Sequence, residues 1–271
     1  HVYDDFAPKL TRRFRVYGVT RRGLGASDRP PVGYSVPRSA NDVLEVLTSL
    51  KLQKPILVGT SCGGWVVTEL GRKHSDRLGG LVYLQGTEDP TMTADDYGLP
   101  VVDYAHLPPS VKPPPAPDYS TFEAYRRSQQ RDAGVAFPEA ELRQLFTAQP
   151  DGSVGPSLLS PVVRRAITVD ARTKPDFADI RVPVLALYRS EPEFADVARE
   201  RPPRNAQEEA ALRQQYAADR AMLSRWERDL RAGVPTARIV ELPGASIYMF
   251  LSNEADVLRE VSAFAATLKA P

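Results

Sequence analysis

Six residues combine a hydroxyl group with three glycines in an order that can support nucleophilic catalysis. Residues 59–64 read GTSCGG, which fits the pattern G-x-S-x-G. They directly follow the apolar run Ile56-Leu57-Val58 and directly precede a stretch of helical character. A sharp strand-to-helix turn there would strain the backbone of the serine, and the glycines would let neighbouring backbones approach. The pattern therefore predicts that Ser61 is a nucleophile.

The residue after the serine is predicted to stabilise negative charge. The backbone N–H of Cys62 opens the expected helix, whose N-terminus carries partial positive charge. We expect this N–H to be an oxyanion donor and the thiol to pack as a small apolar group. Trp65 and Tyr248 are the aromatic residues expected to line a substrate pocket. The alternative without chemistry is a glycine-rich turn with a serine at the helix N-cap.

Apolar periodicity along the chain predicts alternating strands and helices. The expected strands cover residues 14–20, 56–59, 81–84, 182–188 and 237–242. The helices expected to alternate with these strands cover residues 4–13, 38–50, 63–73, 206–231 and 253–269. This alternation predicts the fold class α/β, with a mostly parallel, doubly wound sheet and helices on both of its faces.

The middle of the chain differs from this pattern. Six of the ten residues from Pro108 to Pro117 are proline, which excludes a helix or an inner strand there. Three further helices are expected at residues 119–130, 138–148 and 160–168. We therefore predict a core domain in two parts, residues 1–89 and 176–271, with a helical cap inserted at residues 90–175.

Composition excludes several classes of protein. The 271 residues include 35 basic and 34 acidic ones, so the net charge of +1 offers no surface for nucleic acid or an anionic membrane. No apolar run approaches the ~20 residues of a membrane span. One cysteine excludes an internal disulfide and a cysteine-rich zinc site. We expect a protein that is cytoplasmic or otherwise soluble, without a metal or another cofactor.

Segments along most of the chain resemble the α/β-hydrolase fold superfamily, within its group of capped bacterial serine hydrolases. The similarity covers all but residues ~90–175, where the caps of this family vary. It implies a serine nucleophile, a triad in the chain order serine, acid, histidine, and a small-molecule ester, thioester or amide as substrate. The segments that carry it are HVYDDFAPKL, FRVYGVTRRGLGASDRP, DVLEVL, KPILVGTSCGG, LGGLVYL and VELPGASIYMFLSNEADVLREV.

Both partners of the serine depart from the family pattern. Ile247 occupies the position of the histidine base, and isoleucine cannot accept a proton. Gln85 occupies one of the two positions at which members carry the acid. Four nearby carboxylates, which are expected to be solvated in loops, are alternatives for the acid: Glu88, Asp89, Glu191 and Glu193.

The resemblance begins at the helix before the fourth strand of the family's fold. The earlier strands are therefore expected to be missing from the sequence, including the one that belongs between residues 14–20 and 56–59. An empty place inside a sheet would bury unpaired N–H and C=O groups at a cost of ~1–3 kcal/mol each. We expect either a truncated chain or a sheet that something else completes.

Three hypotheses about function follow. The first is a hydrolase that works through an acyl-Ser61 intermediate, with weak or no turnover because Ile247 replaces the base. The second is a non-catalytic, ligand-binding pseudoenzyme or an inactivated scaffold on the same fold. The third is a lyase-type reaction without a covalent intermediate, with Glu88 or Glu191 as the base.

Overall fold

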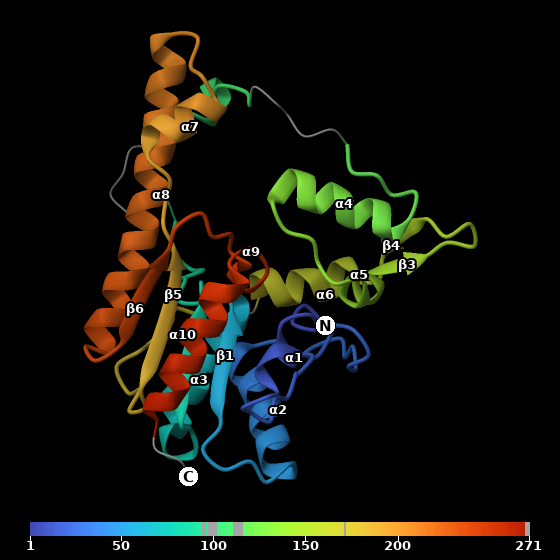
Figure 1. Ribbon diagram of the computed structural model, residues 1–271, viewed down its shortest axis with the longest axis vertical. Coiled ribbons are helices and arrows are strands. Elements are labelled where there is room, and N and C mark those ends of the chain that lie inside the picture. The colour runs from blue at the N-terminus through green and yellow to red at the C-terminus, as the bar shows by residue number, and fades with distance from the viewer. Residues whose placement is uncertain (94–95, 97–101, 111–115, 171, 269–271) are drawn as a thin grey trace.

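A sheet of four parallel strands forms the centre of the molecule (Figure 1). The structure is a computed structural model, which describes residues 1–93, 96, 102–110, 116–170 and 172–268. The spatial order is β1-β2-β5-β6, and each neighbouring pair is parallel. The strands are β1 (Ile56–Thr60), β2 (Gly80–Leu84), β5 (Val184–Arg189) and β6 (Arg238–Leu242). The predicted α/β fold class is confirmed.

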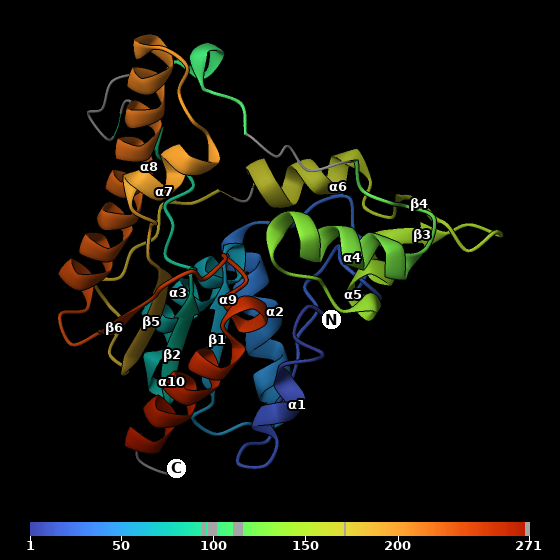
Figure 2. The same ribbon diagram turned by 45° about the horizontal axis from the view of Figure 1, so that its top comes forward.

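Helices cover both faces of this sheet (Figures 1 and 2). In β2, Leu81 and Tyr83 belong to one apolar cluster and Val82 and Leu84 to the other, so the strand is buried on both faces. The first cluster includes α2 (Val36–Ser49), α3 (Cys62–His74) and α8 (Ala206–Gly233). The second includes α9 (Met249–Ser252) and α10 (Glu254–Thr267), and Phe6 before α1 (Ala7–Leu10).

The register of the sheet determines where a site can form. Thr60 at the end of β1 pairs with Leu84 at the end of β2, and Leu84 pairs with Leu187 in β5. The carboxyl ends of these three strands are therefore nearly level. Ligand sites in open parallel sheets form at this edge, so the residues that follow each strand meet there.

A separate layer of short elements lies beside the carboxyl edge of the sheet (Figure 2). Phe122, Leu142 and Val154 form its small core. Its elements are α4 (Phe122–Ala133), α5 (Glu139–Leu145), α6 (Pro161–Arg165), the π-helical turn η4 (Ala166–Asp170) and the antiparallel pair β3 (Phe146–Ala148) and β4 (Val154–Ser157). The remaining short helices are η1 (Ser75–Arg77), η3 (Tyr104–His106) and α7 (Phe194–Glu200).

Two predicted helices are too long. The helix expected at 138–148 ends at Leu145, because residues 146–148 form the ladder with β4 instead. The helix expected at 4–13 is helical only over Ala7–Leu10. Pro8 lies in its first turn, the position in a helix where a missing N–H is harmless, so the helix cannot extend far upstream.

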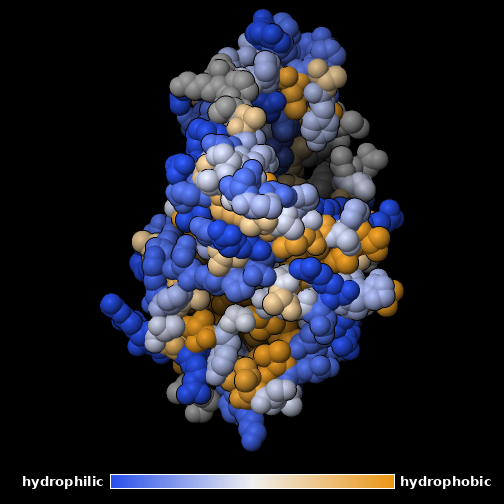
Figure 3. Space-filling view, turned by 90° about the vertical axis from the view of Figure 1, so that its right-hand side faces the viewer, coloured by the Kyte–Doolittle hydropathy of each residue, from blue (hydrophilic) through white to orange (hydrophobic). Residues whose placement is uncertain are grey.

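The strand predicted at residues 14–20 is wrong. These residues form no ladder, because no described strand lies beside them. Within the described residues β1 is therefore an edge strand, and its Val58 is 40% exposed. Figure 3 shows apolar side chains between polar ones on the side of the molecule at the right of Figure 1. Tyr17 and Val19 of the unpaired segment are also exposed.

Two predictions fall partly outside the described residues. The proline connector includes three prolines that lie outside them, Pro113, Pro114 and Pro115. The last helix was expected to end at Lys269, which also lies outside them. Among the helices that the structure describes, none is both long enough and apolar enough to cross a bilayer.

Candidate active site

Ser61 lies at the turn between β1 and α3 with a strained backbone. Its φ is +47° and its ψ is −130°, a combination that side-chain-bearing residues rarely adopt. Its N–H donates to the carbonyl of Gln85 at 3.1 Å, and its carbonyl accepts from the Gly64 N–H at 2.6 Å. These bonds hold the serine at the carboxyl edge of the sheet.

Two of the three glycines in the motif are required by packing. A Cβ on Gly64 would lie 1.8 Å from the carbonyl oxygen of Gly86, and one on Gly59 would lie 2.7 Å from that of Gly63. A Cβ on Gly63 would meet nothing within 4 Å. The close approach of backbones that the motif predicts therefore involves Gly59 and Gly64.

Cys62 is the first residue of α3, so its N–H belongs to the helix N-terminus that can stabilise an anion. The sequence led us to expect that the thiol packs as a small apolar group, but the structure gives it a polar partner. Cys62 is half-buried, and its Sγ accepts a hydrogen bond from Arg21 Nη2 at 3.0 Å. The guanidinium of Arg21 therefore lies against the first turn of α3.

Aromatic residues adjoin the turn. The Tyr3 hydroxyl is 2.6 Å from Thr60 Oγ1, and burial raises the pKa of Tyr3 to about 12. Burial also raises the pKa of Tyr248, with a smaller contribution from the nearby Cys62. The rings of Tyr248 and Phe137 meet edge to face with centroids 4.8 Å apart. Tyr248 thus lies between the turn and the cap elements, and Tyr3 is a neighbour that sequence reasoning missed.

Glu88 is not the solvated loop carboxylate expected from the sequence. Its Oε2 is buried without a hydrogen-bond partner. Burial raises the pKa of Glu88, while its own backbone N–H and, to a smaller extent, the Ser61 side chain oppose this shift. The sequence signal for this residue is weak: Glu88 follows β2 by four residues, and β2 neighbours β1 at the carboxyl edge.

Trp65 lies in the first turns of α3, and its Nε1 donates to the carbonyl of Glu88 at 3.1 Å. This bond ties the helix to the loop after β2. The sequence predicted a role for Trp65 in a substrate pocket, and that role stays a prediction.

Gln85 and Ile247 occupy the positions at which the acid and the base were expected. The side-chain Oε1 of Gln85 accepts from the Arg189 N–H at 2.9 Å, and the backbone N–H of Gln85 donates to the Leu187 carbonyl at 2.9 Å. Gln85 therefore connects the ends of β2 and β5. Ile247 lies in the turn before α9 and is 41% exposed.

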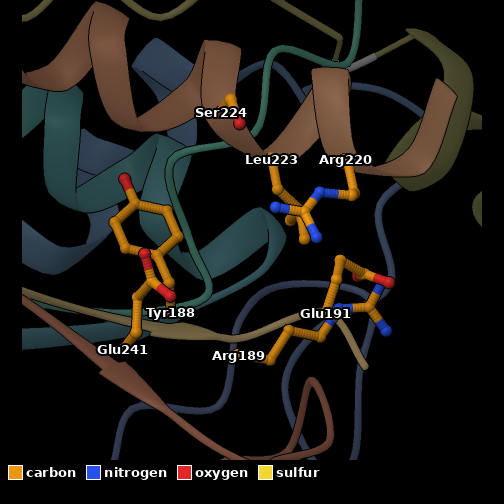
Figure 4. Close-up of a pocket in the computed structure, with 7 residues that line it drawn as sticks. All are labelled: Tyr188, Arg189, Glu191, Arg220, Leu223, Ser224 and Glu241. Atoms are coloured by element: carbon orange, nitrogen blue, oxygen red, sulfur yellow. The ribbon is translucent and has the colours of Figure 1, made fainter. Parts of the chain in front are cut away.

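Glu191, the alternative acid that follows β5, forms an ion pair with Arg189. Glu191 Oε1 is 2.9 Å from Arg189 Nη2. Both line a pocket of about 80 Å³ between the end of β5 and α8, with Arg220, Leu223 and Ser224 on the helix side (Figure 4). Ligand sites of drug-sized molecules usually measure ~300–1,000 Å³. The pocket is too small for such a ligand.

The histidines have other surroundings. His1 and His106 are exposed, and each Nδ1 is 2.8 Å from an aspartate, Asp4 and Asp103 respectively. His74 ends α3, which places it ~20 Å from Ser61 at 1.5 Å per residue. No group of three or more potential ligands for a metal occurs among the described residues.

The fold and the serine turn define the class of this protein. The sequence model of the alpha/beta hydrolase family matches residues 1–260, so the chain belongs to this family. A solved structure of E-2-(acetamidomethylene)succinate hydrolase has a TM-score of 0.63 and 20% identity, over 98% of this chain and 87% of that chain. At this identity the similarity supports the fold alone.

Two curated relatives match over parts of their length. The putative carbamate hydrolase RutD of Caulobacter segnis is 41% identical over 83 residues, which cover 30% of this chain and 31% of that protein. The AB hydrolase superfamily protein YisY of Bacillus subtilis is 30% identical over 185 residues, 65% of this chain and 63% of that protein. The matches thus span less than two thirds of either relative.

Proposed function

We propose that this protein is a slow hydrolase of small-molecule esters, thioesters or amides, with Ser61 as the nucleophile. The strained Ser61 turn between β1 and α3 is the observation that carries the proposal. The hydroxyl at this turn would attack the substrate carbonyl, and the Cys62 N–H would donate to the resulting oxyanion. No cofactor is needed for this chemistry.

The names of relatives support the substrate class. Two of them are named for hydrolysis of a carbamate and of 2-(acetamidomethylene)succinate. We extend this to a small carbonyl compound that is bound between the core and a cap at residues 90–175, with Trp65 and Tyr248 beside it. The loop that carries Glu88 also contributes Asp89 to a cavity of about 270 Å³, close to the size that small ligands occupy. The composition favours a protein that is cytoplasmic or otherwise soluble.

The replacement of the histidine limits the rate. Loss of a triad base lowers kcat by up to ~10⁶, and the oxyanion hole and binding leave ~10³–10⁴ over the reaction in water. The alternative is a non-catalytic, ligand-binding protein. It is favoured by Gln85, whose amide holds the backbone of Arg189 and orients no base.

Hydrolysis of p-nitrophenyl acetate and acetyl-p-nitroanilide by wild type and Ser61→Ala tests the proposal. We expect slow release of p-nitrophenol or p-nitroaniline by the wild type, and release at the background rate by the variant. Equal rates for the two folded proteins would contradict catalysis by Ser61 and would favour the ligand-binding alternative.

A further inference from the structure

We propose that Glu88 is the general base of Ser61 and acts on its hydroxyl directly, in the place of a histidine. This inference rests on the proposed role of Ser61 as a nucleophile. It is carried by two bonds that bring the loop of Glu88 against the serine turn: the Ser61 N–H donates to the Gln85 carbonyl at 3.1 Å, and Trp65 Nε1 donates to the Glu88 carbonyl at 3.1 Å. The Glu88 Oε2 is buried there without a hydrogen-bond partner, and the Ser61 side chain affects the ionisation of this carboxyl.

Three contacts fix the loop that carries Glu88. The backbone carbonyl of Glu88 accepts a hydrogen bond from Trp65 Nε1 in α3, the helix that follows Ser61. Thr87 Oγ1 is 2.6 Å from the hydroxyl of Tyr188 in β5. Gly86 packs against Gly64 so closely that a Cβ there would clash. The loop is therefore tied both to α3 and to β5, which holds the backbone of Glu88 beside the serine turn.

The surroundings make Glu88 a better base than an exposed carboxylate. The Ser61 side chain affects the ionisation of Glu88, and Glu88 in turn helps to raise the pKa of Tyr188, so both side chains lie near the carboxyl. The Trp65 indole bonds to the backbone carbonyl of Glu88 and adjoins the same loop. A carboxylate in a partly dry site has a raised affinity for a proton, which suits general-base catalysis.

The neighbouring carboxylates have other partners. Asp89 Oδ1 accepts from the Thr91 N–H at 2.9 Å and from the Thr91 hydroxyl at 2.6 Å. Glu191 pairs with Arg189. Glu193 is exposed at the start of α7. Of the four carboxylates considered from the sequence, Glu88 is the one that interacts with Ser61.

The reaction balances without another reagent. As Ser61 Oγ bonds to the carbonyl carbon, its proton passes to the Glu88 carboxylate, and the negative charge moves to the carbonyl oxygen beside the Cys62 N–H. The tetrahedral species collapses, the bond to the leaving group breaks, and Glu88 gives the proton to that group. Water then attacks the acyl-serine by the same steps, which releases the acid and restores Ser61 and Glu88.

This mechanism predicts that the ionisation of Glu88 determines how the rate depends on pH. The base must be ionised, and burial raises the pKa of Glu88 above that of an ordinary glutamate. The Ser61-dependent rate should therefore rise with pH through a single ionisation above the ordinary carboxyl range. The measured quantity is p-nitrophenyl acetate hydrolysis from pH 4 to 8, with the rate of Ser61→Ala subtracted.

Glu88→Gln keeps the shape of the side chain and removes the base. We expect its Ser61-dependent rate to fall by about 10²-fold or more and to lose the carboxyl ionisation. Glu193→Gln, which changes an exposed carboxylate, is the matched control and should keep the wild-type profile. A folded Glu88→Gln variant with the wild-type rate would overturn the proposal while leaving the role of Ser61 intact.

A second measurement does not depend on turnover. The Ser61 side chain lowers the pKa of Glu88, so Ser61→Ala should raise that pKa further, as followed by ¹³C NMR of the glutamate carboxyls. Comparison with Glu88→Gln assigns the resonance. An unchanged pKa in Ser61→Ala would overturn the pairing of the two side chains, even in a protein that hydrolyses no ester.

Discussion

At the residue scale, the proposed nucleophile Ser61 has a backbone conformation that destabilises the folded state. A positive φ outside glycine destabilises the folded state by about 1–3 kcal/mol and is retained where the surrounding structure enforces it. In this protein the bonds of Ser61 to Gln85 and Gly64 enforce it. The sequence motif was sufficient to predict this strained turn, because a G-x-S-x-G pattern between an apolar strand and a helix is typical of a sharp turn with the serine at its apex.

Removing the side chain at this position should stabilise the protein. Ser61→Gly relieves the strain, and we expect its free energy of unfolding in urea to exceed that of Ser61→Ala by about 1–3 kcal/mol. The alanine variant retains a Cβ and so separates strain from the loss of the hydroxyl. Equal stabilities of the two variants would show that the turn is not strained.

A base can be restored at residue 247. Ile247 is half-exposed and precedes Tyr248, which lies beside Cys62. Ile247→His should raise kcat/KM for p-nitrophenyl esters by about 10²-fold, since a positioned general base contributes ~10²–10⁴. The double variant with Gln85→Asp, which adds an acid, should be faster still. If neither variant exceeded the wild type, Ile247 would not be what limits the rate.

Glu88 shows what sequence reasoning at this scale misses. A glutamate in a loop is usually solvated, and only the structure shows that the carboxyl of Glu88 is buried. Its neighbours Trp65 and Tyr188 lie 23 and 100 positions away in the chain. Such long-range burial leaves no local pattern.

At the scale of elements, the close approach of α3 to the loop after β2 determines the site. Gly64→Ala places a Cβ against the Gly86 carbonyl, and we expect it to lower the free energy of unfolding by more than about 3 kcal/mol. Gly63→Ala is the matched control in the same helical turn. Because its Cβ meets nothing and alanine favours helix, it should be neutral or stabilising by ~0.5–1 kcal/mol. Similar losses in both variants would contradict the packing.

Elements with strong internal periodicity were predicted well. The helix predicted at residues 38–50 is α2, and the strands at 81–84 and 182–188 are β2 and β5 within a residue or two. The strand predicted at 14–20 failed because a strand exists only with a neighbour to bond to, which composition does not record. The helix predicted at 138–148 failed at Phe146, where pairing with β4 overrides the helical pattern.

At the scale of the whole molecule, an aromatic contact between described residues joins the cap elements to the core. Phe137 precedes α5, and Tyr248 precedes α9. In a double-mutant cycle with Phe137→Leu and Tyr248→Leu we expect a coupling free energy of about 0.5–1.5 kcal/mol in urea unfolding. Phe194→Leu, in a ring pair with Tyr216, should show no coupling to Tyr248→Leu. Additive effects of the two substitutions would contradict the contact between Phe137 and Tyr248.

The account as a whole depends on Ser61 being a reactive nucleophile. The most direct test is the mass of the intact protein after exposure to a fluorophosphonate, followed by mapping of the modified peptide. We predict a single adduct on Ser61 that is absent from Ser61→Ala. A folded wild-type protein that takes up no adduct, or takes it up at another residue, would contradict the central claim.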